Sequence, residues 1–334
     1  MIAKKIGILL TLATSTAFAA GPKATPCLSA KDVKGCLAGV AIATVTTEKS
    51  PEARADGTAS LLTSLAKAGV RRDELLSAAS DEEAAPSYSR WTLALARRTY
   101  ALRYGIDSAA QDSPQRIEAQ AELLRGQRDG LQRLMLAWAA CEAREVAASG
   151  TIAKWDGTLD RLCRVDAVDS ASMEKDFPGL SVLAAAVVDA YNHDEASLGR
   201  SIAASRGVLS EYDKALNRKI STTERVAIQG ILVVGNMLNA TALAISNRGS
   251  EAAKAIEISI GHLAKAPSLG SAPEFQMTLA QASWIYAKAG MREKALATLR
   301  KTLARVDGGS VSGGERASVI GIVIETLRTL ESVR

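Results

Sequence analysis

The clearest pattern of apolar and polar positions in the chain lies in residues 274–305, EFQMTLAQASWIYAKAGMREKALATLRKTLAR. Apolar and small residues recur there at the three- and four-residue spacing of one helix face, and Gly290 interrupts the pattern once. These residues are Met277, Ala280, Trp284 and Ala287 before the glycine, and Ala295, Leu296, Leu299 and Leu303 after it. The stretch predicts a helix, a tight turn and a second helix. Such a hairpin cannot bury its apolar face alone, so we expect similar neighbours.

The same pattern returns around Gly69, where LAKAGVRRDELLSAA matches YAKAGMREKALATL about the glycine. This internal match favours a repeat architecture. Runs that alternate β-branched or aromatic residues with polar ones, as strands do, are scarce. The chain is therefore predicted to be all-α. Further helices are expected over residues 30–45, 51–68, 86–105, 113–148 with a break near 129–130, 151–164, 178–191, 195–216, 221–246, 251–263 and 315–333.

The helix expected over residues 221–246 differs from the others in being apolar nearly all round. It begins with Ser221 and Glu224 in the spacing of a capping box, in which each side chain satisfies a backbone donor at the helix start. A helix without a polar side is typically buried between neighbours. We therefore expect this helix to lie in the core.

Residues 279–303 resemble a tetratricopeptide repeat. Ser283, Tyr286, Gly290, Ala295 and Leu299 match the small, aromatic, turn and packing positions of that motif. Thr302 stands where the family prefers alanine, no proline closes the unit, and the other hairpins vary more in length than a regular 34-residue period allows. The resemblance implies antiparallel helical hairpins stacked as an irregular α-solenoid, with a concave face that holds a protein or peptide.

Three polar residues follow from this resemblance as candidates for partner binding. The expected role of Trp284 and Leu299 is to pack neighbouring helices, so a binding site should use polar positions beside them on the first helix. Those positions are Gln276, Gln281 and Lys288.

The first nineteen residues have the three parts of a signal peptide. Lys4 and Lys5 supply the positive start, residues 6–13 are apolar, and Ala17-Phe18-Ala19 forms an A-x-A cleavage site. The alternative, an uncleaved amphipathic helix, does not require these parts in this order. No later stretch reaches about 18 uninterrupted apolar residues, so we expect no transmembrane segment in the mature chain. The predicted location is periplasmic or secreted.

Four cysteines, an even number in an exported chain, favour two disulfides. Of the three possible pairings we prefer Cys27 with Cys36 and Cys141 with Cys163, because each pair belongs to one short segment. No C-x-x-C motif occurs, and neither histidine stands at ligand spacing from a cysteine, so we expect no metal and no cofactor.

A polar interruption near residues 165–175 divides the chain into two expected regions. Residues 20–165 would form an N-terminal helical region that holds the disulfides, residues 166–177 a linker or long loop, and residues 178–334 the repeat-like C-terminal part. Removal of Lys4 and Lys5 with the signal peptide lowers the formal net charge from +5 to +3, which is too weak a bias to indicate nucleic-acid binding.

Catalytic motifs are incomplete. Ser64 with Lys67 and Ser172 with Lys175 fit S-x-x-K, the nucleophile motif of penicillin-recognising serine enzymes, but S-D-N and K-T-G are absent. The glycines of residues 309–314 lack the Lys-Ser/Thr of a phosphate loop. The sequence therefore favours a non-enzymatic scaffold that binds a protein or peptide. The alternative is an envelope hydrolase with an unconventional site, in which a histidine or Ser64 meets a carboxylate.

Overall fold

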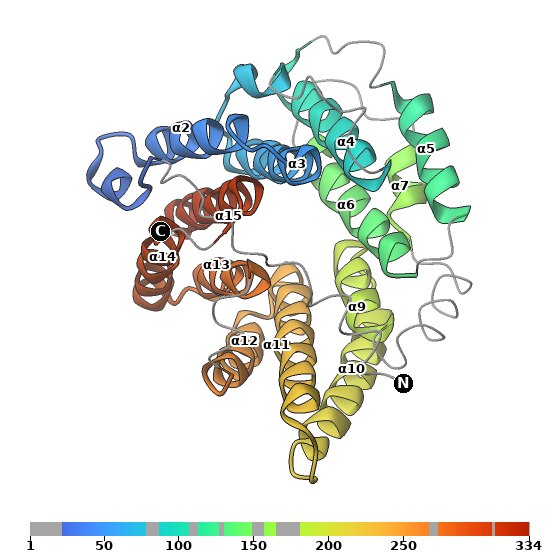
Figure 1. Ribbon diagram of the computed structural model, residues 1–334. Helices are drawn as coiled ribbons and strands as arrows, with labels where there is room; N and C mark the ends of the chain where they lie inside the picture. Colours follow the sequence, from blue (N-terminus) through green and yellow to red (C-terminus); the bar gives the residue numbers. More distant parts are fainter. Residues whose placement is uncertain are drawn as a thin grey trace. The chain divides into compact units, whose positions relative to one another are not determined.

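The computed structural model describes residues 22–77, 87–106, 113–126, 130–148, 157–164, 181–266, 273–308 and 311–333 (Figure 1). Every regular element in these ranges is a helix, so the all-α prediction is confirmed. The expected signal peptide and the expected linker over residues 166–177 lie outside the described residues. The chain forms two compact units, residues 182–311 and residues 21–181 with 312–332, which are described separately.

We call the first of these the α9–α14 unit and the second the α2–α7/α15 unit. The α9–α14 unit contains α9 (Ser181–Tyr191), α10 (Glu195–Ala215), α11 (Thr222–Ile245), α12 (Gly249–Ala264), α13 (Pro273–Lys288) and α14 (Arg292–Asp307). The α2–α7/α15 unit contains the 3-10 helices η1 (Thr25–Ser29) and η2 (Asp73–Leu76), with α2 (Val33–Thr46), α3 (Pro51–Ala68), α4 (Ser87–Tyr104), α5 (Pro114–Gly126), α6 (Gly130–Ala148), α7 (Thr158–Leu162) and α15 (Gly313–Ser332).

Helix ends marked by capping residues match the predicted ones most closely. Ser50 accepts the Ala53 N–H at the start of α3, which ends at the left-handed Gly69. The capping box of α11 is present, with the Glu224 N–H donating to Ser221 Oγ and the Ser221 N–H donating to Glu224 Oε2. The prediction was less accurate for α2, which begins at Val33, capped by Asp32, instead of near residue 30, because residues 25–29 form η1.

Three successive hairpins make up the α9–α14 unit: α9 with α10, α11 with α12, and α13 with α14. Each turn contains one left-handed residue, His193, Asn247 or Gly290. The N–H of the next residue reaches back to a carbonyl five positions earlier, with N···O distances of 3.2 Å from Asp194, 2.8 Å from Arg248 and 2.9 Å from Met291. This closure satisfies the last carbonyls of the helix. Only in the third of these hairpins is the left-handed residue a glycine.

The segment around Gly69 shares this helix ending but does not form the second half of a hairpin. The Val70 N–H closes α3 on the Leu65 carbonyl at 2.9 Å, after which the chain continues into the short η2. Arg72 holds this link, because its N–H donates to the Tyr100 hydroxyl and its guanidinium to the Gly35 carbonyl. The match between Gly69 and Gly290 therefore reflects a common way of ending a helix.

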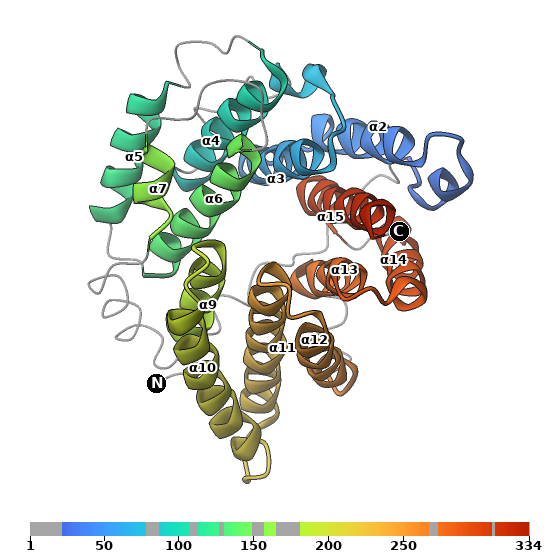
Figure 2. The ribbon, with the colours of Figure 1, turned by 180° about the vertical axis from the view of Figure 1, so that it is seen from behind.

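The last helix, α15, packs on α3 and α2, so the expected grouping of residues 178–334 is wrong for its final part (Figures 1 and 2). Glycines allow the close approach: a Cβ on Gly57 would lie 2.5 Å from Gly314 Cα. Glu48 fixes the start of α15 by accepting the Gly313 N–H at 2.6 Å, while its other oxygen accepts the Ser50 N–H at 2.9 Å. The N-terminal residues therefore need the C-terminal helix to complete their core.

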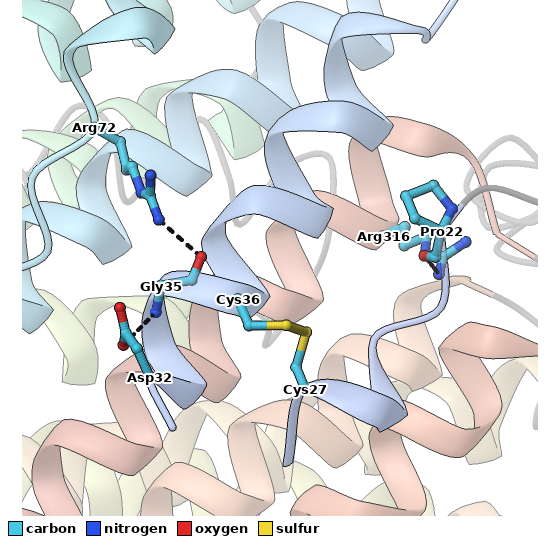
Figure 3. The surroundings of a disulfide bond; sticks show 7 residues. All are labelled: Pro22, Cys27, Asp32, Gly35, Cys36, Arg72 and Arg316. Atoms are coloured by element: carbon cyan, nitrogen blue, oxygen red, sulfur yellow. Dashed lines mark hydrogen bonds between the residues drawn. A yellow bond between two sulfur atoms is a disulfide. The ribbon is translucent and has the colours of Figure 1, made fainter. Parts of the chain in front are cut away.

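Both disulfides join cysteines that are close in sequence. Cys27 of η1 pairs with Cys36 of α2 at a Cα–Cα distance of 5.4 Å, and Cys141 of α6 pairs with Cys163 at the end of α7 at 4.7 Å. Figure 3 shows the first pair beside the Arg72 contact to Gly35. These are the pairs preferred from the sequence. Closing such short loops in the unfolded chain stabilises the fold by about 3 kcal/mol per disulfide.

We expect Gly314→Ala to lower the free energy of unfolding by about 1–3 kcal/mol, because the new methyl group would enter the backbone of α3 at Ala53. Gly39→Ala is the matched control, since Gly39 lies in α2 with nothing within 4 Å of an added Cβ. That change should stabilise the protein by about 0.5–1 kcal/mol. Urea unfolding followed by circular dichroism measures both. Equal effects would contradict the proposed packing of α15 on α3.

We expect no free thiol in the oxidised protein when it is denatured without reductant, and four after reduction, because all four cysteines are paired. Titration with a thiol reagent gives the count. Four free thiols before reduction would show that the disulfides do not form.

Candidate functional site

The longest helix of the α9–α14 unit, α11, packs against neighbours on two of its sides. Towards α10, Ser205 Oγ donates to Asn239 Oδ1 at 2.7 Å. Towards α12, Ser259 Oγ donates to the Val233 carbonyl at 2.7 Å. All four of these residues are buried, so hydrogen bonds satisfy the polar groups that the packing encloses. These two sides of α11 are structural.

A third side of α11 remains partly exposed and is apolar. Ile231, Val234 and Leu238 follow one another at helical spacing on this side, and 36% of Val234 is exposed. On α13, a second partly exposed stripe contains Met277, Gln281, Trp284 and Lys288. We call these seven residues together the α11–α13 face.

One hydrogen bond shows that the two stripes lie side by side. Gln281 Nε2 donates to Thr241 Oγ1 at 3.2 Å, and Thr241 continues the α11 stripe one turn beyond Leu238. In Figures 1 and 2, α11 and α13 are neighbours from both viewpoints. The apolar stripe of α11 therefore continues into the mixed stripe of α13.

The charged end of the face is held in place by an aromatic ring. Lys288 Nζ lies 5.7 Å from the centroid of the Trp284 ring, which is within the range of a cation–π interaction. Lys288 is itself exposed. The α11–α13 face can thus offer apolar contacts along α11, an aromatic surface at Trp284 and one positive charge beside it.

Of the three residues predicted to bind a partner, two lie on this face. Gln281 and Lys288 belong to it, whereas Gln276 is only 2% exposed and offers no surface to a partner. Gln276 lies one turn before the fully buried Ala280 and shares its inward direction. A shift of one position along a helix, from 276 to 277, separates the buried side from the exposed one.

The α11 residues of the face were not predicted, because an apolar helix without a polar side gives no sequence signal for the direction it exposes. In the described residues, α11 is the helix that is long and apolar enough to cross a membrane by length and composition. However, 67% of its most apolar 18-residue stretch is buried in the structure. That burial is typical of a core helix.

A second cluster of functional groups lies in the α2–α7/α15 unit. Ser64 Oγ donates to Glu325 Oε1 at 2.5 Å, and Lys67 Nζ lies 2.9 Å from Glu142 Oε1 and 3.9 Å from Glu325 Oε2. Burial raises the pKa of Glu325, although Lys67 and Ser64 lower it. The cluster links α3, α6 and α15 through one cation between two carboxylates.

The S-x-x-K pair is thus brought to a carboxylate, as the hydrolase alternative requires, but Ser64 is enclosed. Only 3% of Ser64 is exposed, and a Cβ on Gly321 of α15 would lie 2.9 Å from its Oγ. A substrate carbonyl could reach this oxygen only if α3 and α15 separated. Nucleophilic attack needs an accessible oxygen, so the arrangement favours a structural role.

Of the remaining candidates, Ser172, Lys175 and residues 309–310 of the glycine-rich stretch lie outside the described residues. His193 is the exposed left-handed residue of the α9–α10 turn. In the described part of the chain, no group of three or more His, Cys, Asp or Glu residues is placed to hold a metal ion.

No family model matches the chain, and neither the curated proteins nor the solved structures contain a match.

We expect Lys67→Met to lower the free energy of unfolding by about 2–3 kcal/mol at pH 7.5, because two carboxylates lose their common cation in a largely buried place. The loss should be smaller at pH 5, since the pKa of Glu325 is already raised and its proton removes one of the charges. Urea unfolding at the two pH values tests this.

Two controls accompany this measurement. Adding Glu325→Gln to Lys67→Met should recover part of the stability at pH 7.5, because the buried charge is then gone. Lys294→Met, which removes the exposed pair between Lys294 and Glu257, should cost no more than about 1 kcal/mol. If Lys67→Met and Lys294→Met had the same effect at both pH values, the Lys67 cluster would not hold α15 in place.

Proposed function

We propose that this protein is an exported helical-repeat scaffold that binds a protein or peptide partner through the α11–α13 face. The observation that carries the proposal is the partly exposed apolar stripe of Ile231, Val234 and Leu238 beside Trp284 and its cation. Apolar side chains grouped on one surface of a folded chain are typical of an interaction site. The adjoining Gln281 and Lys288 supply the polar edge that such sites have.

The resemblance to tetratricopeptide repeats is supported by how its matching residues pack. Ser283, Tyr286, Ala295 and Leu299 are all buried, and Gly290 has the left-handed conformation of a turn glycine. α11 and α13 are the first helices of their hairpins, and in that family the first helices line the concave binding surface. The hairpins depart from the family in their spacing, because the left-handed residues His193, Asn247 and Gly290 stand more than 34 residues apart.

Export is supported by the two disulfides together with the signal-peptide pattern of residues 1–19. Disulfides persist in oxidising compartments such as the periplasm and the extracellular space. A scaffold in such a compartment would meet envelope or secreted proteins. An apolar peptide segment with a carboxylate that could reach Lys288 is the chemistry that the face fits best.

Site-specific photo-crosslinking in the native compartment tests this proposal. A benzophenone amino acid placed at position 234 or 284 should form a crosslink to a discrete protein or peptide, because both positions lie on the face. The same amino acid at position 258 should not, since Ile258 is 52% exposed but lies on α12, which contributes no residue to the face.

Substitutions extend the same comparison. Val234→Glu should reduce the crosslink from position 284 at least tenfold, which corresponds to about 1.4 kcal/mol of lost binding. Ile258→Glu is the matched control and should leave it unchanged. If position 258 crosslinks as well as positions 234 and 284, or if the face forms no crosslink, the α11–α13 face is not the binding site.

A further inference from the structure

His262 lies in the last turn of α12 and is buried without a complete set of polar partners. Only 7% of the residue is exposed, and its Nδ1 has no hydrogen-bond partner among the described residues. Its Nε2 lies 3.9 Å from Asp213 Oδ1, beyond hydrogen-bonding distance. A buried imidazole in this situation is stable when it is neutral.

The surroundings of His262 offer little compensation for a positive charge. The charged groups that act on it are Asp213 from α10 and Lys265, the residue that follows α12. The neighbouring Leu263 belongs to an apolar cluster with Val233 of α11 and Leu279 of α13, and Val226 of α11 packs against this cluster. Asp213 attracts a protonated imidazole, but 61% of its side chain is exposed, so solvent weakens the attraction.

Burial therefore outweighs the single carboxylate and lowers the pKa of His262. In the unfolded chain a histidine titrates near pH 6.5. Because the folded protein binds this proton less readily than the unfolded chain, stability is complete above about pH 6.5 and is lost as the pH falls towards the pKa of the folded state.

We propose that His262 is an acid-sensitive switch of the α9–α14 unit, in which protonation places an incompletely compensated charge between α10 and α12 and loosens the packing of α12. Since α12 packs on both α11 and α13, the loosening would disturb the helices that carry the α11–α13 face. We therefore expect the α11–α13 face to bind its partner more weakly in acid, an expectation that rests on the proposed function.

The chain contains only two histidines, which makes the titration direct. In an NMR titration of the folded protein, the His262→Gln variant assigns the two imidazole signals. We expect the midpoint of His262 to lie below about 6.5, the value of a histidine in an unfolded chain. A midpoint equal to or above that value would overturn the proposal.

Unfolding provides the second readout. Between pH 7.5 and 5, the unfolding equilibrium of the wild type should change relative to His262→Gln. The expected change is up to tenfold towards the unfolded state for each pH unit by which the His262 midpoint lies below about 6.5, the value in an unfolded chain. Identical pH dependence of the wild type and His262→Gln would overturn the switch.

A second variant guards against a structural defect in His262→Gln. Asp213→Asn keeps the imidazole and removes the attracting carboxylate, so the His262 midpoint should fall further and the relative loss of stability in acid should increase. An unchanged midpoint would contradict the assigned surroundings. None of these measurements needs a partner, so a failure of the crosslinking experiment would count against the proposed function and leave the switch to be judged on its own data.

Discussion

The structure depends on how closely its helix backbones can approach one another. Small residues set these distances: Gly57 and Gly314 bring α3 and α15 together, and Gly249 lets the start of α12 lie against Ala289 beyond α13. At Gly235 of α11, an added Cβ would lie 2.6 Å from the Leu209 side chain of α10. Van der Waals contact of this kind is sensitive to a single methyl group, so it determines which helices become neighbours. The C-terminal helix consequently belongs with the first helices of the chain.

The α11–α13 face is not packed in this way, because part of it is exposed to water. The polar groups on the other sides of α11 are hydrogen-bonded and buried, whereas the stripe that includes Val234 leaves apolar surface in contact with water. Such exposure reduces the stability that burial would give, and the proposed binding role would account for its presence. His262 lies on α12, which packs on both α11 and α13, so protonation of His262 would act on the helices that form the face.

Local signals in the sequence predicted the helices and their ends well. Ser50 and Ser221 fix helix starts through contacts within one turn, and the disulfide pairs follow from short separations. The placement of α15 could not be predicted in this way, because the meeting of Gly57 with Gly314 joins residues far apart in sequence. For the site, Gln281 and Lys288 were predicted on the exposed side of α13, but Gln276 was assigned to that side although it is buried. The apolar half of the face lies on α11. It could not be predicted, because α11 has no polar side in its sequence to show which side of the helix is exposed.

The most direct measurement of the central claim is hydroxyl-radical footprinting of the protein, free and with its crosslink-identified partner, read out by mass spectrometry. Met277 and Trp284 are reactive side chains on the α11–α13 face, and Leu123 is a 72% exposed reference on α5 in the other unit. Our account predicts that the partner slows the oxidation of Met277 and Trp284 and leaves that of Leu123 unchanged. Protection of Leu123 with no change at Met277 and Trp284 would contradict it.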